Sequence, residues 1–111
     1  MTNLERLSLE LAHKNYFSNE EYTVLLEENG LDATKEYNKI SDQLGLLQTV
    51  VAVFEALQGN IDLFRTVNTE FSTNTSAYQN IKDRIDQLNK RIASIPEHQR
   101  TNKTITYIFS N

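Results

Sequence analysis

Hydrophobic residues recur at intervals of three and four along most of this chain, which is the spacing of one face of an α-helix. The pattern predicts four helices, at about residues 3–14, 19–29, 33–58 and 76–94. We expect them to form a small, mainly α-helical bundle, folded as a single domain over residues 1–96. Residues 97–111 are then a C-terminal extension.

Polar residues mark the beginnings of the first two helices. Thr2 and Ser18 are each followed three residues later by a glutamate, Glu5 and Glu21. This spacing is typical of a capping box, in which the two side chains satisfy backbone amides that the first helical turn leaves without a partner. The same pattern, Ser-x-x-Gln, places the beginning of the last helix at Ser76.

The second helix is the most clearly delimited. Phe17 and Tyr22 stand at the two positions of a hydrophobic staple around the predicted cap. Gly30 can adopt the left-handed conformation that ends a helix, and Leu31 can then fold back onto Leu26, as in a Schellman motif. We therefore expect a short, acidic helix with both ends fixed.

The third helix is predicted to be the longest, with Asp32 as its cap. Its apolar stripe consists of Tyr37, Ile40, Leu44, Leu47, Val51 and Phe54, and it is widened toward the C-terminal end by Val50, Val53 and Leu57. That half should be buried on more than one side. Gly45, a mild helix weakener, indicates a close contact with a neighbouring helix.

Two segments have the composition of strands. Residues 63–71 alternate and contain Thr, Val and Phe, which favours a minor β element, although the same residues also satisfy helical spacing. Residues 72–75 are expected to form the corner between this element and the last helix. A second strand is predicted at about 103–109, rich in β-branched and aromatic residues.

Composition and charge limit the classes of protein to which this chain can belong. The chain of 111 residues has a net charge of −4, and its densest basic run, residues 81–91, is interleaved with Asp83 and Asp86. A solvated helix face is the better interpretation of that run than a nucleic-acid site. There is no cysteine, the apolar stretch at 44–57 is short for a bilayer, and the N-terminus lacks the layout of a signal peptide. We expect a soluble, non-secreted protein that is not in a membrane.

Candidates for chemistry are few. His13 and His98 have no metal-ligand spacing around them and are interpreted as surface histidines. The acidic pair at residues 20–21 fits a helix N-terminus, whereas the pair at 27–28 is either solvated or the site of an Arg or Lys partner. No catalytic residue, metal site or cofactor site is predicted, and we do not expect an enzyme.

The remaining feature is a set of apolar side chains that are candidates for contact with another protein chain. The candidate protein-interface residues are Phe71, Tyr78, Ile105, Tyr107 and Phe109. An exposed terminal strand is an aggregation hazard unless another strand covers it. It can pair with the 63–71 element of the same domain or be added to a neighbouring subunit, and the sequence leaves both open.

The segment YFSNEEYTVLLEENGLD, the long helix after it and FRTVNTEFSTNTSAYQNIKDRIDQL resemble the small head–tail connector proteins of tailed bacteriophages, also called adaptor or head-completion proteins. The family pattern is matched here by Phe17, Ser18, Glu20, Glu21, Leu25, Leu26, Glu27 and Gly30. The resemblance covers about residues 3–95. A Gly-rich hairpin near 59–72 is lacking, and the family pattern does not specify the C-terminal tail.

The resemblance implies a structural role without catalysis. Such proteins form a homo-oligomeric ring beneath the portal protein, in the neck of the virion, after assembly in the host cytoplasm. The ring prolongs a channel through which genomic DNA passes, and tail or neck proteins attach to it. The alternative is a small acidic helical regulator or inhibitor that binds a host or phage protein.

Overall fold

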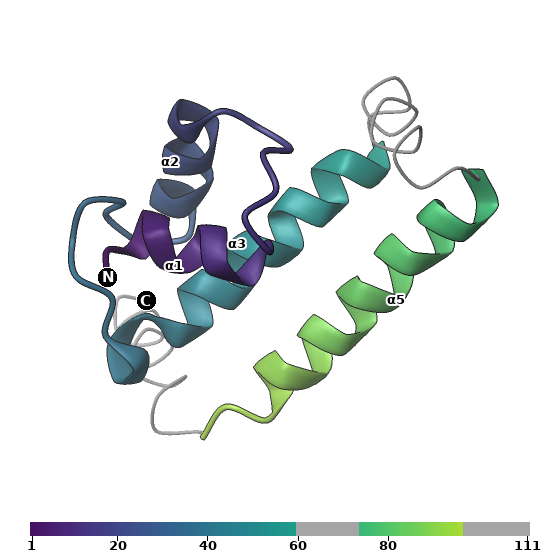
Figure 1. Ribbon diagram of the computed structural model, residues 1–111. Helices are drawn as coiled ribbons and strands as arrows, with labels where there is room; N and C mark the ends of the chain where they lie inside the picture. The colour runs from purple at the N-terminus through teal and green to yellow at the C-terminus, as the bar shows by residue number, and fades with distance from the viewer. Residues whose placement is uncertain (60–73, 97–111) are drawn as a thin grey trace, which may run out of the picture.

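The computed structural model describes residues 1–59 and 74–96, with side chains from residue 79 onward in the second range. These residues form a small helical bundle of four helices: α1 (Asn3–Glu10), α2 (Asn19–Glu28), α3 (Lys39–Gly59) and α5 (Asn74–Ala93). The two long helices, α3 and α5, lie side by side and run in opposite directions (Figure 1). The two short helices, α1 and α2, pack against α3, which is therefore the centre of the bundle.

The hydrophobic core is built around α3. Its fully buried residues include Leu46, Val50, Val53 and Leu57, so the C-terminal half is covered on more than one side, as predicted. The other helices and the residues just after them contribute the buried side chains Leu7, Leu11, Tyr22, Leu26, Ile81, Leu88 and Ile95. One member of the predicted stripe, Ile40, remains 65% exposed because it lies in the first turn of α3.

The sequence predicted both ends of α2 correctly. Ser18 accepts a hydrogen bond from the Glu21 amide, and the Glu21 carboxylate accepts one from the Ser18 amide. Phe17 packs edge-to-face on Tyr22, with ring centroids 6.1 Å apart. At the other end Gly30 has a φ of 81°, which places it in the left-handed region.

The rest of the Schellman motif is also formed at that end. The Leu31 amide donates to the Leu26 carbonyl oxygen at 2.9 Å, and the Gly30 amide donates to that of Glu27 at 3.0 Å. Leu26 and Leu31 are both buried in the core. The chain therefore leaves α2 in a fixed direction.

The predicted beginning of the third helix, residue 33 with Asp32 as its cap, is wrong. Asp32 instead closes a turn by accepting hydrogen bonds from the amide and hydroxyl of Thr34. The following backbone is used by the N-terminal segment: the amides of Asn3 and Leu4 donate to carbonyl oxygens of residues 35 and 33. Residues 33–37 thus have partners from far along the chain, and this pairing replaces a helical turn.

Helix α3 begins at Lys39, six residues after the predicted position. Asn38 caps it by accepting hydrogen bonds from the amides of Ile40 and Ser41, while the Asp42 carboxylate accepts one from the Asn38 amide. Gly45 of this helix is buried in close contact with the end of α2, as the sequence predicted. A Cβ added at Gly45 would lie 2.8 Å from the Asn29 carbonyl oxygen, so α3 approaches the end of α2 more closely than a larger residue allows.

Two further boundaries differ from prediction. The first helix has the predicted capping box at Thr2 and Glu5, but it ends at Glu10 rather than at residue 14. Ala12 and His13 have φ angles of 54° and 60°, and this left-handed backbone turns the chain away. The last helix begins at Asn74, so Ser76 lies inside it and is not its cap.

Three of the predictions fall outside the described residues: the β element at 63–71, the strand at 103–109 and the extension at 97–111. Within the described part of the chain, the β structure is one isolated bridge between Thr2 and Glu36. The corner predicted at residues 72–75 is partly outside as well, and its last two residues are already helical.

One helix, α3, is long and apolar enough to cross a membrane by length and composition alone. The apolar stretch judged too short for a bilayer, residues 44–57, is only part of this helix, which spans Lys39–Gly59. The buried side chains of α3 are packed on the other three helices, and the core helix of a globular bundle has the same length and composition.

Candidate functional site

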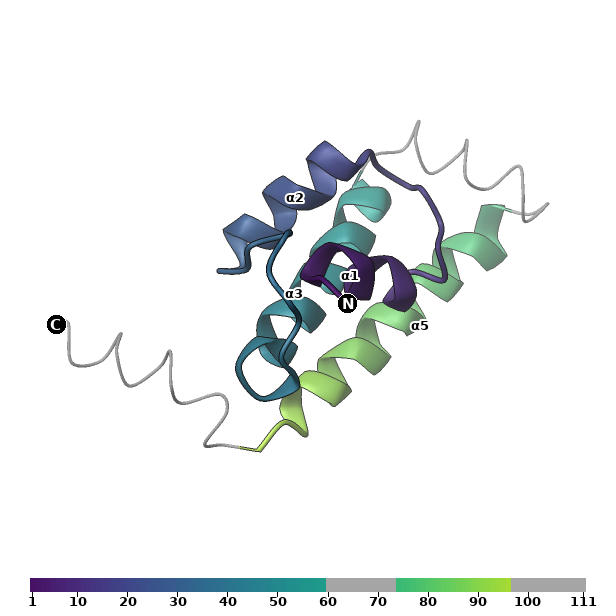
Figure 2. The same cartoon turned by 60° about the vertical axis from the view of Figure 1, so that its left-hand side comes forward.

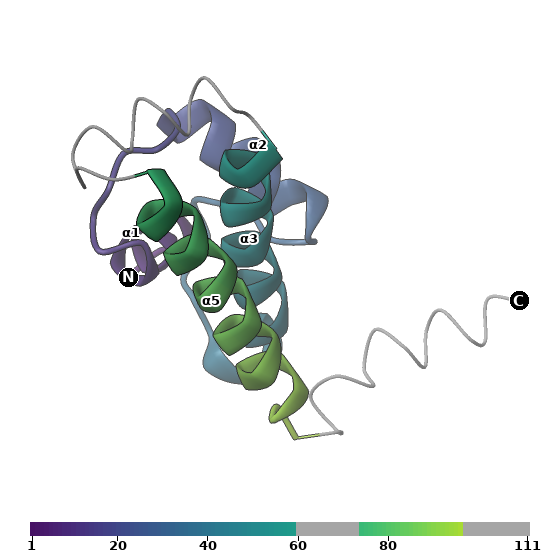
Figure 3. The same ribbon diagram turned by 90° about the vertical axis from the view of Figure 1, so that its right-hand side faces the viewer.

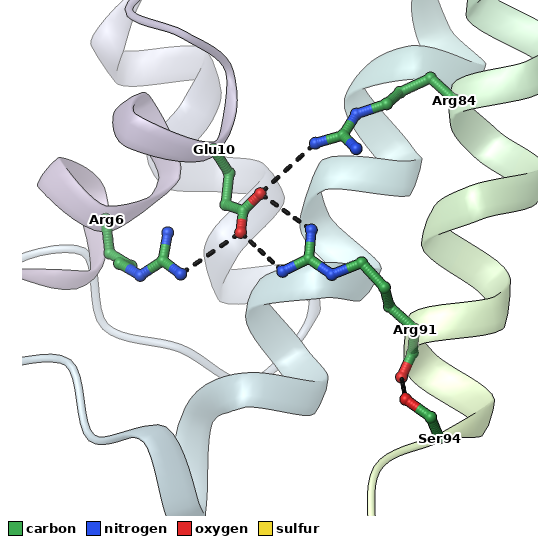
Figure 4. Close-up of polar contacts among 5 residues, drawn as sticks. All are labelled: Arg6, Glu10, Arg84, Arg91 and Ser94. Carbon is green, nitrogen blue, oxygen red and sulfur yellow. Dashed lines mark hydrogen bonds and ion pairs between the residues drawn. The ribbon is translucent and has the colours of Figure 1, made fainter.

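A cluster of three arginines surrounds the carboxylate of Glu10 (Figure 4). Arg91 binds it with both terminal nitrogens, at 2.8 Å and 3.1 Å. Arg6 and Arg84 each reach it with one nitrogen, at 3.3 Å and 3.5 Å. We call Arg6, Arg84 and Arg91 around Glu10 the arginine cluster.

Helical geometry explains why these four side chains converge. Arg6 and Glu10 are four residues apart on α1, so they are neighbours on one face. Arg84 and Arg91 are seven residues apart on α5, two turns along one face. Among the described residues no Cα atom of α1 lies within 8 Å of a Cα atom of α5. The long side chains of the arginine cluster therefore bridge these two helices.

The charges of the arginine cluster do not cancel. Three guanidinium groups face one carboxylate, so the net charge is +2, three positive charges minus one. The hydrogen bonds from Arg91, and then the charges of the three arginines, lower the pKa of Glu10 although burial opposes this. The hydrogen bond to Glu10 in turn raises the pKa of Arg91. Both shifts favour the charged forms of Glu10 and Arg91.

Burial differs between the centre and the edge of the arginine cluster. The Glu10 side chain is only 8% exposed, whereas those of Arg6, Arg84 and Arg91 are 25%, 34% and 40% exposed. The guanidinium of Arg6 also lies over the Tyr37 ring, 5.4 Å from its centroid, in a cation–π contact. The surplus positive charge thus faces outward, while the carboxylate that holds it together is covered.

A second charged surface lies on the outer side of α2. Glu20, Glu21, Glu27 and Glu28 are all exposed there, and between them Val24 is 53% exposed. These five residues are the acidic face. They point away from Tyr22 and Leu26, the two residues with which α2 packs into the core.

The described residues offer little for catalysis or metal binding. Within residues 1–59 and 74–96, no group of three or more His, Asp or Glu side chains is placed to hold a metal ion. His13 is exposed, as predicted, and its Nδ1 lies 3.2 Å from the Ser8 hydroxyl oxygen. In the same ranges no carboxylate forms an ion pair with His13, so the structure shows no acidic partner that would orient it as a general base.

The predicted interface residues are not brought together in the described part of the chain. Phe71, Ile105, Tyr107 and Phe109 lie outside it, as does His98. Tyr78 is in the second turn of α5, and its side chain is outside the described residues. These residues therefore stay predictions.

The arginine cluster was missed by the sequence analysis. Lys82, Asp83, Asp86 and Lys90 are exposed, as a solvated face requires, but the two arginines of that run turn toward Glu10. One signal was available: Glu10 stands in the last turn of its helix, where the helix dipole disfavours a negative charge. A carboxylate in that place implies a compensating cation.

Comparison of the chain with protein families, with characterised proteins and with solved structures finds no match.

Proposed function

We propose that this chain is a head–tail connector of tailed bacteriophages, a structural virion protein that forms a ring between the portal and the tail or neck components and performs no catalysis. The observation that carries the proposal is the order of elements. A short helix with both ends capped, α2, leads into a long core helix, α3, and a final helix, α5, packs along it. This is the layout that the resemblance of residues 3–95 implies.

The charge of the chain suits this role. Genomic DNA has to slide through the channel of such a ring without being held, and a net charge of −4 gives no attraction to phosphate. The acidic face of α2 adds to that effect wherever it lies near the channel. The surplus positive charge of the arginine cluster then serves contacts between proteins.

The test is electron microscopy of the purified chain mixed with portal assemblies from the same phage. We expect rings, or an added layer of density at one end of the portal. A portal that stays bare in the presence of excess chain contradicts the proposal. The chain alone is a poor test of ring formation on a portal, because a connector ring can need its template to close.

A small acidic regulator of another protein is the second candidate, and the acidic face of α2 favours it. An exposed helix face with four glutamates around one valine fits a basic, partly apolar surface on a target. The two functions differ in copy number: a regulator binds its target in one or two copies, whereas a connector binds in many. The neighbouring genes separate them as well, because a connector gene is expected beside those for portal and capsid proteins.

A further inference from the structure

The chain carries two exposed surfaces of opposite charge, and each has an exposed apolar side chain beside its charged residues. In the acidic face, glutamates surround the exposed Val24. Next to the arginine cluster, Leu9 is 47% exposed and lies three residues after Arg6, on the neighbouring position of the α1 surface. Each surface therefore combines one exposed apolar side chain with a net charge, negative on the acidic face and positive at the arginine cluster.

These two surfaces cannot meet within one chain. Helices α2 and α5 pack on different sides of α3 (Figures 2 and 3), and among the described residues no Cα atom of α2 lies within 8 Å of one of α5. Within the described residues Glu20, Glu27 and Glu28 form no ion pair. The complementary surface that each one lacks is present on another copy of the same chain.

We infer that the arginine cluster of one copy binds the acidic face of α2 of a second copy. The inference rests on the proposed function, since it names the faces through which subunits of the ring would touch. Two different surfaces meet in such a contact, so it is head-to-tail, and repetition of one rotation closes a ring or extends a filament.

The side chains have the chemistry for this contact. A guanidinium group has five N–H donors in a fixed fork that fits a carboxylate. Arg84 uses one nitrogen on Glu10, at 3.5 Å, and its side chain is 34% exposed, so it can turn its fork to an incoming carboxylate. Arg91 stays on Glu10 and fixes the cluster. Val24 then lies against Leu9 and buries the apolar part of both surfaces.

The association of the full-length chain should depend on salt. Screening shortens from about 10 Å at 0.1 M salt to about 3 Å at 1 M, so a contact through exposed charges weakens over that range. Sedimentation equilibrium at chain concentrations up to about 1 mM would detect even a contact of only about −4 kcal/mol. We expect reversible self-association at low salt that is lost at high salt. A chain that stays monomeric at low salt up to that concentration overturns the inference.

Two variants test the faces themselves. E27K/E28K reverses part of the acidic face, and R84E reverses the loosest member of the arginine cluster. Each alone should weaken self-association at least about tenfold, because like charges then face each other. An equimolar mixture should associate again, since each variant keeps the surface that the other one needs. Circular dichroism of each variant shows whether it is folded.

The matched control is D83K/D86K, two exposed acids on α5 outside both surfaces. Like E27K/E28K, it raises the net charge by four, because each change from acid to lysine adds two. The control should associate as the wild-type chain does. Equal weakening of both double variants, or a mixture that does not recover, shows that overall charge and not these two faces governs association.

Failure of the inference can be told apart from failure of the proposed function. If E27K/E28K still forms rings on the portal as the wild-type chain does, the connector function stands and the subunit contact lies elsewhere. If the chain associates through the two faces but leaves the portal bare, the contact stands and the connector function fails.

Discussion

Replacing Glu10 by Gln removes the only negative charge from the arginine cluster and keeps the size of the side chain. Three guanidinium groups then face one another around a neutral amide. Because the Glu10 side chain is 8% exposed, water has little access to the space where the charge is lost. We expect the bridge between α1 and α5 to weaken, and with it the stability of the whole bundle.

The size of the effect follows from burial. Removing one partner of a fully buried ion pair costs about 3–5 kcal/mol. Here the arginines are 25–40% exposed, so water and salt recover part of that cost, and we reduce the expected loss to about 2 kcal/mol. For a domain of about 100 residues this corresponds to a decrease of the melting temperature by about 10 °C.

The assay is urea and thermal unfolding of the Glu10→Gln variant, followed by circular dichroism. Glu27→Gln is the control, because that side chain is exposed and forms no ion pair within the described residues; it should change stability by less than about 0.5 kcal/mol. A Glu10→Gln variant as stable as this control at neutral pH refutes the reasoning.

The dependence on pH gives a second criterion. The pKa of Glu10 is lowered in the folded chain from its ordinary value of 4.5, first by the hydrogen bonds from Arg91. The stabilisation is therefore fully present above that value and is lost as the pH falls through the lowered pKa. The wild-type chain and the Gln variant should converge in stability at acidic pH. A difference that stays constant down to low pH contradicts the assigned cause.

Three further predictions concern the core and the tail. Gly45→Ala should lower the free energy of unfolding by about 1–2 kcal/mol, measured as a lower urea midpoint, because the added Cβ lies 2.8 Å from the Asn29 carbonyl oxygen and this outweighs the better helix propensity. Tyr22→Phe should cost about 1–3 kcal/mol, because the hydroxyl donates to the Lys14 carbonyl oxygen and accepts from two amides. Burial raises the pKa of Tyr22 above 10, so the stabilisation by its hydroxyl should be present below pH 10 and lost as the pH rises through the raised pKa. Urea unfolding at neutral and at alkaline pH measures the cost of the substitution and its dependence on pH. Deleting residues 97–111 should keep the helical circular dichroism, because these residues lie outside the apolar stripes of the predicted helices, and should weaken assembly on the portal; a loss of helix shows instead that the tail belongs to the core.

Local signals predicted the ends of α2 well. The capping box of Ser18 and Glu21, and the turn at Gly30, each involve residues within about five positions of one another. Such hydrogen bonds depend on the local sequence alone and form wherever the helix forms. Gly45 was similarly informative, because a glycine in the middle of a long helix has few roles other than a close approach.

Long-range pairing explains what the sequence did not reveal. The beginning of α3 is set by hydrogen bonds between the N-terminal segment and residues 33–37, about 30 positions away. In the arginine cluster, Glu10 and Arg91 are 81 positions apart. No periodicity links such residues, and only the packing of α1, α3 and α5 brings them together. The end of α1 at Glu10 depends on the left-handed backbone of Ala12 and His13, and an alanine gives no signal of that conformation.

The connector function is tested most directly by the mass of the complex. In native mass spectrometry of portal assemblies with excess chain, the mass of the portal should increase in steps of 12.8 kDa. The increase should stop at one fixed number of bound copies, many per portal, as a closed ring requires. An unchanged portal mass contradicts the account. A complex with one or two copies of the chain on a target contradicts it as well, and assigns the chain to the regulator class.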